Sequence, residues 1–106
     1  GAFPLWLSPV QVKVLPVSEK HNTYANEVLA ALRAANIRAE VDDANESLGK
    51  KIRNAKTEKV PYLLVVGDKE VEAKTVSIES RDAGKIGTTS LSDFIIKVTE
   101  EIKRRA

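Results

Sequence analysis

Several segments of the chain carry the alternating or continuous apolar patterns of β-strands. Residues 11–17 alternate polar and apolar side chains before becoming apolar, and residues 37–41 alternate throughout. The run 62–66 is continuously apolar and is followed by Gly67-Asp68, which is typical of a central strand covered on both faces. A further strand is predicted over residues 75–79. The pattern therefore predicts a sheet with residues 62–66 at its centre.

Apolar positions at helical spacing predict three helices. The first lies between Ser18, which can cap a helix start, and Asn36, which tolerates the left-handed conformation that ends one. The second covers residues 48–55 and has a narrow apolar stripe among basic side chains, so we expect it to be short and amphipathic. The third follows Ser90 and Asp93, which form a capping box before an apolar stripe.

Strands and helices alternate through the first two thirds of the chain, which favours parallel pairing with right-handed crossovers. A later hairpin-like segment adds an antiparallel strand. We therefore predict an α/β fold, a mixed sheet flanked by three helices, and a single domain in this chain of 106 residues. Residues 1–9 contain Pro4 and Pro9 and are predicted to be a linker from a missing domain, with the folded domain at residues 10–106. Because the chain lacks methionine, we expect it to be a piece of a longer protein.

Composition excludes several classes of function. Hydrophobic residues make up 42% and charged residues 30%, which is ordinary for a soluble domain. A net charge of +2 is too small for binding duplex DNA by charge alone, so no DNA partner is expected. The absence of cysteine excludes thiolate zinc sites and is consistent with a cytoplasmic protein. The apolar opening is too short to span a bilayer, so no membrane partner is expected.

Catalytic motifs are absent from the sequence. There is no GxGxxG, no GxxxxGK[ST] and no GxSxG. His21 is the only histidine, and we expect it to hydrogen-bond nearby backbone. Asp42, Asp43 and Asp68 weakly resemble a magnesium pocket, although paired acids at a strand end are more often turn formers. We predict no catalytic residue and no metal ligand, and catalysis by this chain would have to use these four side chains.

In contrast to catalytic motifs, polar side chains that can recognise nucleobases are present in the sequence. Asn45 and Glu46 precede the basic helix, Arg53 lies on it and Glu70 follows the central strand. These side chains could converge near the strand ends, where open α/β sheets bind ligands. Arginine and asparagine form bidentate bonds to base edges, and glutamate accepts from amino or imino groups. Lysines that could meet phosphates lie alongside: Lys50, Lys51, Lys56 and Lys59. Composition alone favours an ordinary charged surface.

Longer motifs connect these residues to a known family. Residues 6–25, 41–55 and 60–72, with the motifs L-x-P-V-Q-V, H-N-x-Y-A, G-x-K-I-R and V-P-Y-x-L-V-V-G-D-K-E-V-E, closely resemble the C-terminal anticodon-binding domain of bacterial-type threonyl-tRNA synthetase. The resemblance implies a five-stranded mixed sheet with three helices and a tRNA anticodon loop as ligand. It implies a parent ligase that joins threonine to its tRNA, a homodimer whose missing catalytic domain uses ATP, magnesium and zinc. This chain itself should need no cofactor, bind without catalysing, and be monomeric or weakly self-associating.

The resemblance also implies the site. Asn45, Lys51, Arg53 and Glu70 match the family's anticodon contacts, which help select the middle guanine and final uracil of threonine anticodons. Where some members have an arginine that reads guanine, this chain has Glu79, and the nearest cation is Arg81. Guanine recognition would then require Arg81 or Lys51 to take over the role of that arginine. A carboxylate in the site would repel phosphate. The predicted RNA contacts are therefore Asn45, Lys51, Arg53, Glu70 and Arg81.

A second hypothesis comes from a different class of function. The same fold could serve as a protein-interaction module without specific RNA binding, using the exposed end around Trp6 and the last helix. The two cations that many family members carry within residues 44–47, and that are missing here, fit this alternative.

Overall fold

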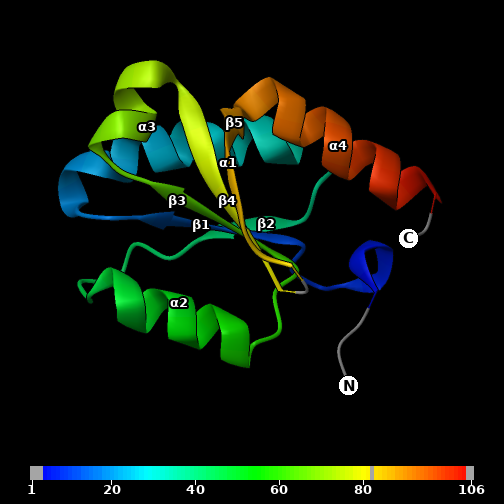
Figure 1. Ribbon diagram of the computed structural model, residues 1–106, viewed down its shortest axis with the longest axis horizontal. Coiled ribbons are helices and arrows are strands. Elements are labelled where there is room, and N and C mark those ends of the chain that lie inside the picture. The colour runs from blue at the N-terminus through cyan, green and yellow to red at the C-terminus, as the bar shows by residue number, and fades with distance from the viewer. Residues whose placement is uncertain (1–3, 82, 105–106) are drawn as a thin grey trace.

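The computed structural model describes residues 4–81 and 83–104, which form one layered α/β unit (Figure 1). Its five-stranded sheet has the order β2-β1-β3-β4-β5. β1 pairs in parallel with β2 and β3, whereas β3–β4 and β4–β5 are antiparallel, which confirms the predicted mixed sheet. The strands are β1 (Val12–Pro16), β2 (Ala39–Val41), β3 (Tyr62–Val66), β4 (Thr75–Ser80) and β5 (Gly84–Ser90).

The three predicted helices are confirmed. They are α1 (Asn22–Ala34), which follows a 3₁₀ turn η2 (Glu19–His21), α2 (Leu48–Thr57) and α4 (Leu91–Arg104). The predicted terminal signals are present, because Asn36 has φ 63° and the Ser90 hydroxyl accepts a hydrogen bond from the Asp93 amide at 3.2 Å.

One helix of the described chain was not predicted. α3 (Asp68–Ala73) has six residues and follows β3 where the sequence indicated only a turn. It is too short to show a helical apolar period, and none of its residues is buried. A local bond holds its first turn, since the Gly67 amide donates to Glu70 Oε1 at 2.8 Å. Lys74 ends the helix in the left-handed conformation, with φ 57°.

The helices cover the two faces of the sheet unequally. α1 and α4 lie on one face, and α2 lies alone on the other (Figure 1). The larger hydrophobic cluster fills the first interface and includes the fully buried Phe94 and Leu64. The smaller cluster joins α2 to β1 and β3 through Leu15, Ala55 and Leu63. Because α2 sits over β1 and β3, the part of this face formed by β4 and β5 is left open.

A short 3₁₀ helix, η1 (Leu5–Leu7), precedes the sheet and is attached to it by polar contacts. The Arg38 guanidinium donates to the carbonyls of Ser8 and Trp6, each at 2.9 Å. The buried Gln11 amide donates to the Leu5 carbonyl at 3.1 Å. The predicted linker therefore includes residues that pack on the domain, while residues 1–3 of it lie outside the described residues. None of the described helices combines the length and apolar character needed to cross a bilayer.

Candidate nucleic-acid interface

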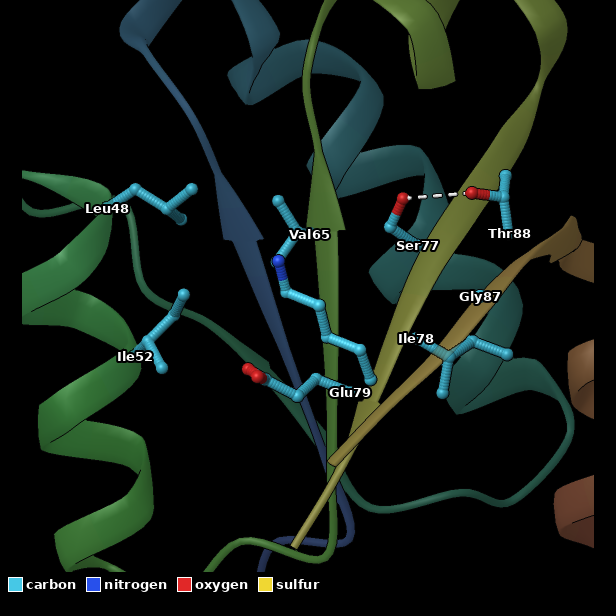
Figure 2. A pocket seen from close by; sticks show the side chains of 9 residues that line it. Leu48, Ile52, Val65, Ser77, Ile78, Glu79, Gly87 and Thr88 are labelled. Atoms are coloured by element: carbon cyan, nitrogen blue, oxygen red, sulfur yellow. Dashed lines mark hydrogen bonds between the residues drawn. The ribbon is translucent and has the colours of Figure 1, made fainter. Parts of the chain in front are cut away.

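A groove lies between α2 and the open half of the sheet (Figure 2). It encloses about 320 Å³. Its walls combine apolar side chains from α2 and β3 with polar side chains from β4 and β5. The lining residues are Leu48, Ile52, Val65, Ser77, Ile78, Glu79, Lys85, Gly87 and Thr88.

A β-bulge sets which β5 side chains face this groove. Ile78 pairs with Gly87, but the next β4 residue, Glu79, pairs with Lys85, so β5 uses one extra residue, Ile86. Side chains alternate between the faces of a strand, so without the extra residue Lys85 would point to the opposite face. The bulge therefore places Lys85 directly across the strand pair from Glu79, on the groove side of the sheet.

Glu79 is the acidic residue among those that line the groove. Its side chain is only 13% exposed, and Lys56 Nζ is 3.8 Å from its Oε1. That distance is an ion pair but exceeds a hydrogen bond. Figure 2 shows the carboxylate extending from β4 toward Ile52 of α2. Within the part of the chain that the structure describes, no group donates a hydrogen bond to this carboxylate.

The groove-facing rim of α2 is basic and accessible. Ile52 lines the groove, and the helical spacing places Gly49 and Lys56 beside it on the same side of the helix. Arg53 is a neighbour of both Gly49 and Lys56, farther round the helix from Ile52. Arg53 is exposed, and its guanidinium makes no hydrogen bond or ion pair with the described residues. A Cβ at Gly49 would meet nothing within 4 Å, so the rim is open there.

A second hollow of about 400 Å³ lies at the carboxyl end of β1 and contains two predicted contacts. Asn45 is exposed in it. Lys51 also lines it, but this residue is only 3% exposed, and its Nζ donates to the Pro16 carbonyl at 3.0 Å. Leu48 lines the groove and Lys51 lines the hollow, so the first turn of α2 separates the two spaces.

Glu70 joins α3 to the end of the groove. Its Oε1 accepts from the Gly67 amide at 2.8 Å, and its Oε2 accepts from the Ser77 hydroxyl at 3.2 Å. Ser77 also lies 3.2 Å from the Thr88 hydroxyl across the strand pair (Figure 2). Glu70 is therefore anchored by the protein, with lone pairs left over because a carboxylate can accept about four bonds.

Arg81 lies at the other end of β4. Its backbone amide donates to the Pro61 carbonyl at 2.8 Å, and its Nη1 donates to the Lys59 carbonyl at 3.2 Å. It comes four positions after Ser77, roughly 13 Å along a strand at about 3.3 Å per residue. Arg81 and Glu70 are therefore placed at opposite ends of the groove.

Most of this chain matches a known protein family. The family model described as "Anticodon binding domain" matches residues 11–101. The chain belongs to this anticodon-binding domain family.

The relatives most similar to this chain include threonine–tRNA ligases from bacteria. The chain is 54% identical over all its 106 residues to threonine–tRNA ligase of Caldanaerobacter subterraneus subsp. tengcongensis. It is 53% identical over 105 residues, 99% of its length, to the ligase of Clostridioides difficile. The chain spans only 16% of the length of each. The resemblance to the anticodon-binding domain of threonyl-tRNA synthetase is confirmed.

Two solved synthetase structures contain the same fold. The RNA-binding domain of threonyl-tRNA synthetase from Cryptosporidium parvum Iowa II matches with a TM-score of 0.89 and 32% identity, covering 94% of this chain and 25% of that one. Prolyl-tRNA synthetase from Cryptosporidium parvum matches with a TM-score of 0.84 and 28% identity, covering 98% of this chain and 23% of that one.

In this anticodon-binding domain, the structure brings some predicted contacts together and separates others. Asn45 and Lys51 share the hollow, Arg53 stands on the rim of α2, and Glu70 reaches the groove through Ser77. Arg81 lies apart from them. Sequence reasoning did not identify the cross-strand pairing of Glu79 with Lys85, because the bulge that creates it depends on how two strands pair. The alternating polar residues of β4 were the available signal.

His21 has a structural role in the domain. Its Nδ1 accepts from the Ser18 amide at 3.2 Å, which confirms the predicted backbone bond. The ring proton therefore sits on Nε2, which donates to Asp68 at 2.7 Å. This bond from His21, together with the Lys20 ammonium 3.2 Å away, holds the pKa of Asp68 below its usual range. The link ties the start of α1 to the start of α3.

Asp42, another acidic candidate, stabilises a turn. Asp42 accepts from the Ala44 amide at 3.2 Å, which confirms the predicted turn-forming role for this carboxylate. Among residues 4–81 and 83–104, no group of three or more His, Asp or Glu side chains is arranged to hold a metal ion.

Proposed function

We propose that this domain binds the anticodon loop of threonine tRNA, as the anticodon-recognising part of a threonyl-tRNA synthetase. The observation that carries the proposal is the open groove on a domain whose close relatives are threonine–tRNA ligases. The ligation of threonine to tRNA, and the ATP, magnesium and zinc that we expect it to use, belong to the rest of that longer protein. We further propose a cytoplasmic homodimer, with this domain itself monomeric or weakly self-associating.

The groove suits unstacked bases. Ile52 and Val65 offer an apolar surface on which a base can lie, and the hydroxyls of Ser77 and Thr88 can donate or accept at its edge. The free guanidinium of Arg53 on the rim can bind a base edge bidentately or a phosphate. Anticodon loops present unstacked bases on a charged backbone, which is the ligand that this combination fits.

The five predicted contacts take different parts in this proposal. Arg53 and Asn45 are exposed and can reach RNA directly. Lys51 and Glu70 each satisfy protein bonds, so they contribute the donors or lone pairs that remain and keep their neighbours in place. Arg81, at the far end of β4, would meet a different nucleotide from the one near Glu70.

The alternative, a protein-interaction module without specific RNA binding, receives no support from the comparisons. The relatives are threonine–tRNA ligases, and one of the matching structures is an RNA-binding domain of threonyl-tRNA synthetase. No observation in the groove favours a protein partner over RNA.

Anisotropy titration of the domain with threonine and non-threonine anticodon stem-loops, at two salt concentrations, tests the proposal. We expect tighter binding of the threonine stem-loop and a loss of affinity with salt, because phosphate contacts release counterions. The affinity will be modest, because the rest of a synthetase would supply a second attachment to the tRNA. Equal, salt-insensitive affinity for all stem-loops would overturn the proposal.

A further inference from the structure

Two side chains of the motif H-N-x-Y-A, residues 21–25, lie outside both spaces described above. His21 and Tyr24 are buried and line neither the groove nor the second hollow. They stand three positions apart at the start of α1, so their side chains leave the helix on the same side. Their hydrogen bonds lead to the two ends of α3.

Through these side chains, α1 holds α3 at both ends, and Figure 1 shows α3 and the start of α1 at the same end of the sheet. His21 Nε2 donates to Asp68, the first residue of α3, at 2.7 Å. The Tyr24 hydroxyl donates at 2.8 Å to the carbonyl of Thr75, just after the helix. The ammonium of Lys74, the C-cap of α3, lies 5.3 Å from the centre of the Tyr24 ring, within range of a cation–π contact.

The short helix α3 depends on such contacts for its position. It has six residues and buries none of them, and a helix of this length is unstable in isolation. Val71 gives it an apolar contact, because this side chain is partly buried against the larger hydrophobic cluster. The direction in which α3 lies is then set by the hydrogen bonds at its ends.

α3 carries Glu70, which is one of the proposed RNA contacts. The Gly67 amide and the Ser77 hydroxyl hold its carboxylate and leave it lone pairs for a base edge. Hydrogen bonds to a base weaken steeply when their distance or angle departs from the optimum. A shift of α3 would therefore reduce the selection of the base that Glu70 contacts, while phosphate contacts elsewhere remain.

We infer that His21 and Tyr24 are positioning residues for RNA selection, because they hold α3 where Glu70 meets a base. The inference rests on the proposed function, since it takes Glu70 as an RNA contact. Neither His21 nor Tyr24 needs to touch RNA. Their effect should therefore be on the preference among bases rather than on overall affinity.

The test measures affinities for a threonine anticodon stem-loop and for three copies of it that each differ at one anticodon base. Glu70→Gln should lower the preference at one base, because an amide has one acceptor oxygen where a carboxylate has two, and this identifies the base that Glu70 selects. Asp68→Ala, which removes the acceptor of the His21 bond, should lower the preference at that same base about tenfold. Asp68→Asn keeps an oxygen that can accept from His21 Nε2, and should keep the preference within about twofold.

Variants of α1 test the same contacts from the other side. His21→Asn keeps an oxygen for the Ser18 amide but has no group that reaches Asp68. It should lower the same preference about tenfold, and combining it with Asp68→Ala should add little, because both break one bond. Tyr24→Phe keeps the ring but loses the bond to Thr75, and should lower the preference about threefold.

The matched control is Asp93→Ala, which removes an exposed aspartate from the first turn of α4 and should leave every preference unchanged. The inference is overturned if Asp68→Ala keeps the full preference, or if it weakens binding of all four stem-loops equally, as a purely structural role would. It is also overturned if Asp68→Asn loses as much as Asp68→Ala, or if Glu70→Gln changes no preference.

These results can be told apart from a failure of the proposed function. An intact domain that prefers none of the four stem-loops contradicts the proposed function itself. The Asp68 side chain is 73% exposed, so both of its variants should fold, and melting temperatures check this. The comparison of Asp68→Ala with Asp68→Asn therefore decides the inference even if His21→Asn does not fold.

Discussion

The two faces of the sheet differ in how completely helices cover them, and β4 contributes to both. Val76 and Ile78 point into the core beneath α1 and α4 and are buried. Ser77 and Glu79, which alternate with them, line the groove beside α2. One strand therefore stabilises the fold with every second side chain and offers the others to a ligand. The covered face should govern stability and the open face RNA binding.

The largest expected effect lies on the covered face. Phe94 of α4 is fully buried and its ring packs edge-on against Tyr62, with centroids 5.5 Å apart. Phe94→Ala should lower the free energy of unfolding by about 3–5 kcal/mol, as expected for loss of a buried ring and the cavity left behind. Denaturant unfolding measures this, and Thr88→Ala on the open face should change stability by about 0.5 kcal/mol at most. Similar losses of unfolding free energy in both variants would contradict the claim that the covered face governs stability.

The next effect is on binding through the open face. Arg53→Ala should weaken the affinity for a threonine anticodon stem-loop by about 1–3 kcal/mol if the guanidinium contacts a base bidentately. Its stability should stay within about 0.5 kcal/mol of wild type, because the side chain is exposed. Lys103→Ala, an exposed cation near the end of α4, is the matched control and should leave the affinity unchanged. Unaltered binding by Arg53→Ala would exclude this residue from the site.

A smaller gain in stability is expected from filling the open rim. Gly49 lies in the first turn of α2, and a Cβ there meets nothing within 4 Å. Gly49→Ala should raise the free energy of unfolding by about 0.5–1 kcal/mol through helix propensity alone. Thermal unfolding checks this. A drop in melting temperature would mean that this rim is less open than the structure indicates.

The smallest expected effect is on stability and comes from Asp68, which links the start of α3 to the start of α1. Bonds from His21 and Lys20 lower the pKa of Asp68, so its contribution to stability is present above the ordinary aspartate range. It should be lost as the pH falls through the lowered pKa, below about 4. Melting curves of wild type and Asp68→Asn should differ at pH 7 and converge at low pH. A constant difference across this range would contradict the assignment.

Local pattern was enough to predict most of the fold. The apolar run of β3 matches the predicted residues, and Asn36 and Ser90 mark helix ends through their own backbone and side-chain chemistry. Ser18 does not cap α1 directly, because it precedes the 3₁₀ turn η2 and His21 is the N-cap of α1. The short helix α3 was missed because six residues show no period, although the local Glu70 to Gly67 bond sustains it. These elements are determined by interactions between residues that are close in sequence.

The site was less accessible to sequence reasoning because it depends on tertiary pairing. Arg53 could be placed on the second helix from the sequence alone. The burial of Lys51 and its bond to Pro16 arise from α2 packing on β1. The cross-strand pairing of Glu79 with Lys85 follows from a β-bulge that no local sequence signal indicates. Residue types that suit RNA were predictable, whereas which of them face one groove was not.

The central claim is that RNA binds in the groove between α2 and β4–β5. Backbone amide NMR shifts, recorded as a threonine anticodon stem-loop is titrated into the domain, test it most directly. The account predicts shifts concentrated at Ile52, Arg53, Ser77, Glu79 and Thr88, with the exposed faces of α1 and α4 unaffected. Shifts concentrated on α1 and α4 instead, with the groove residues unchanged, would contradict it.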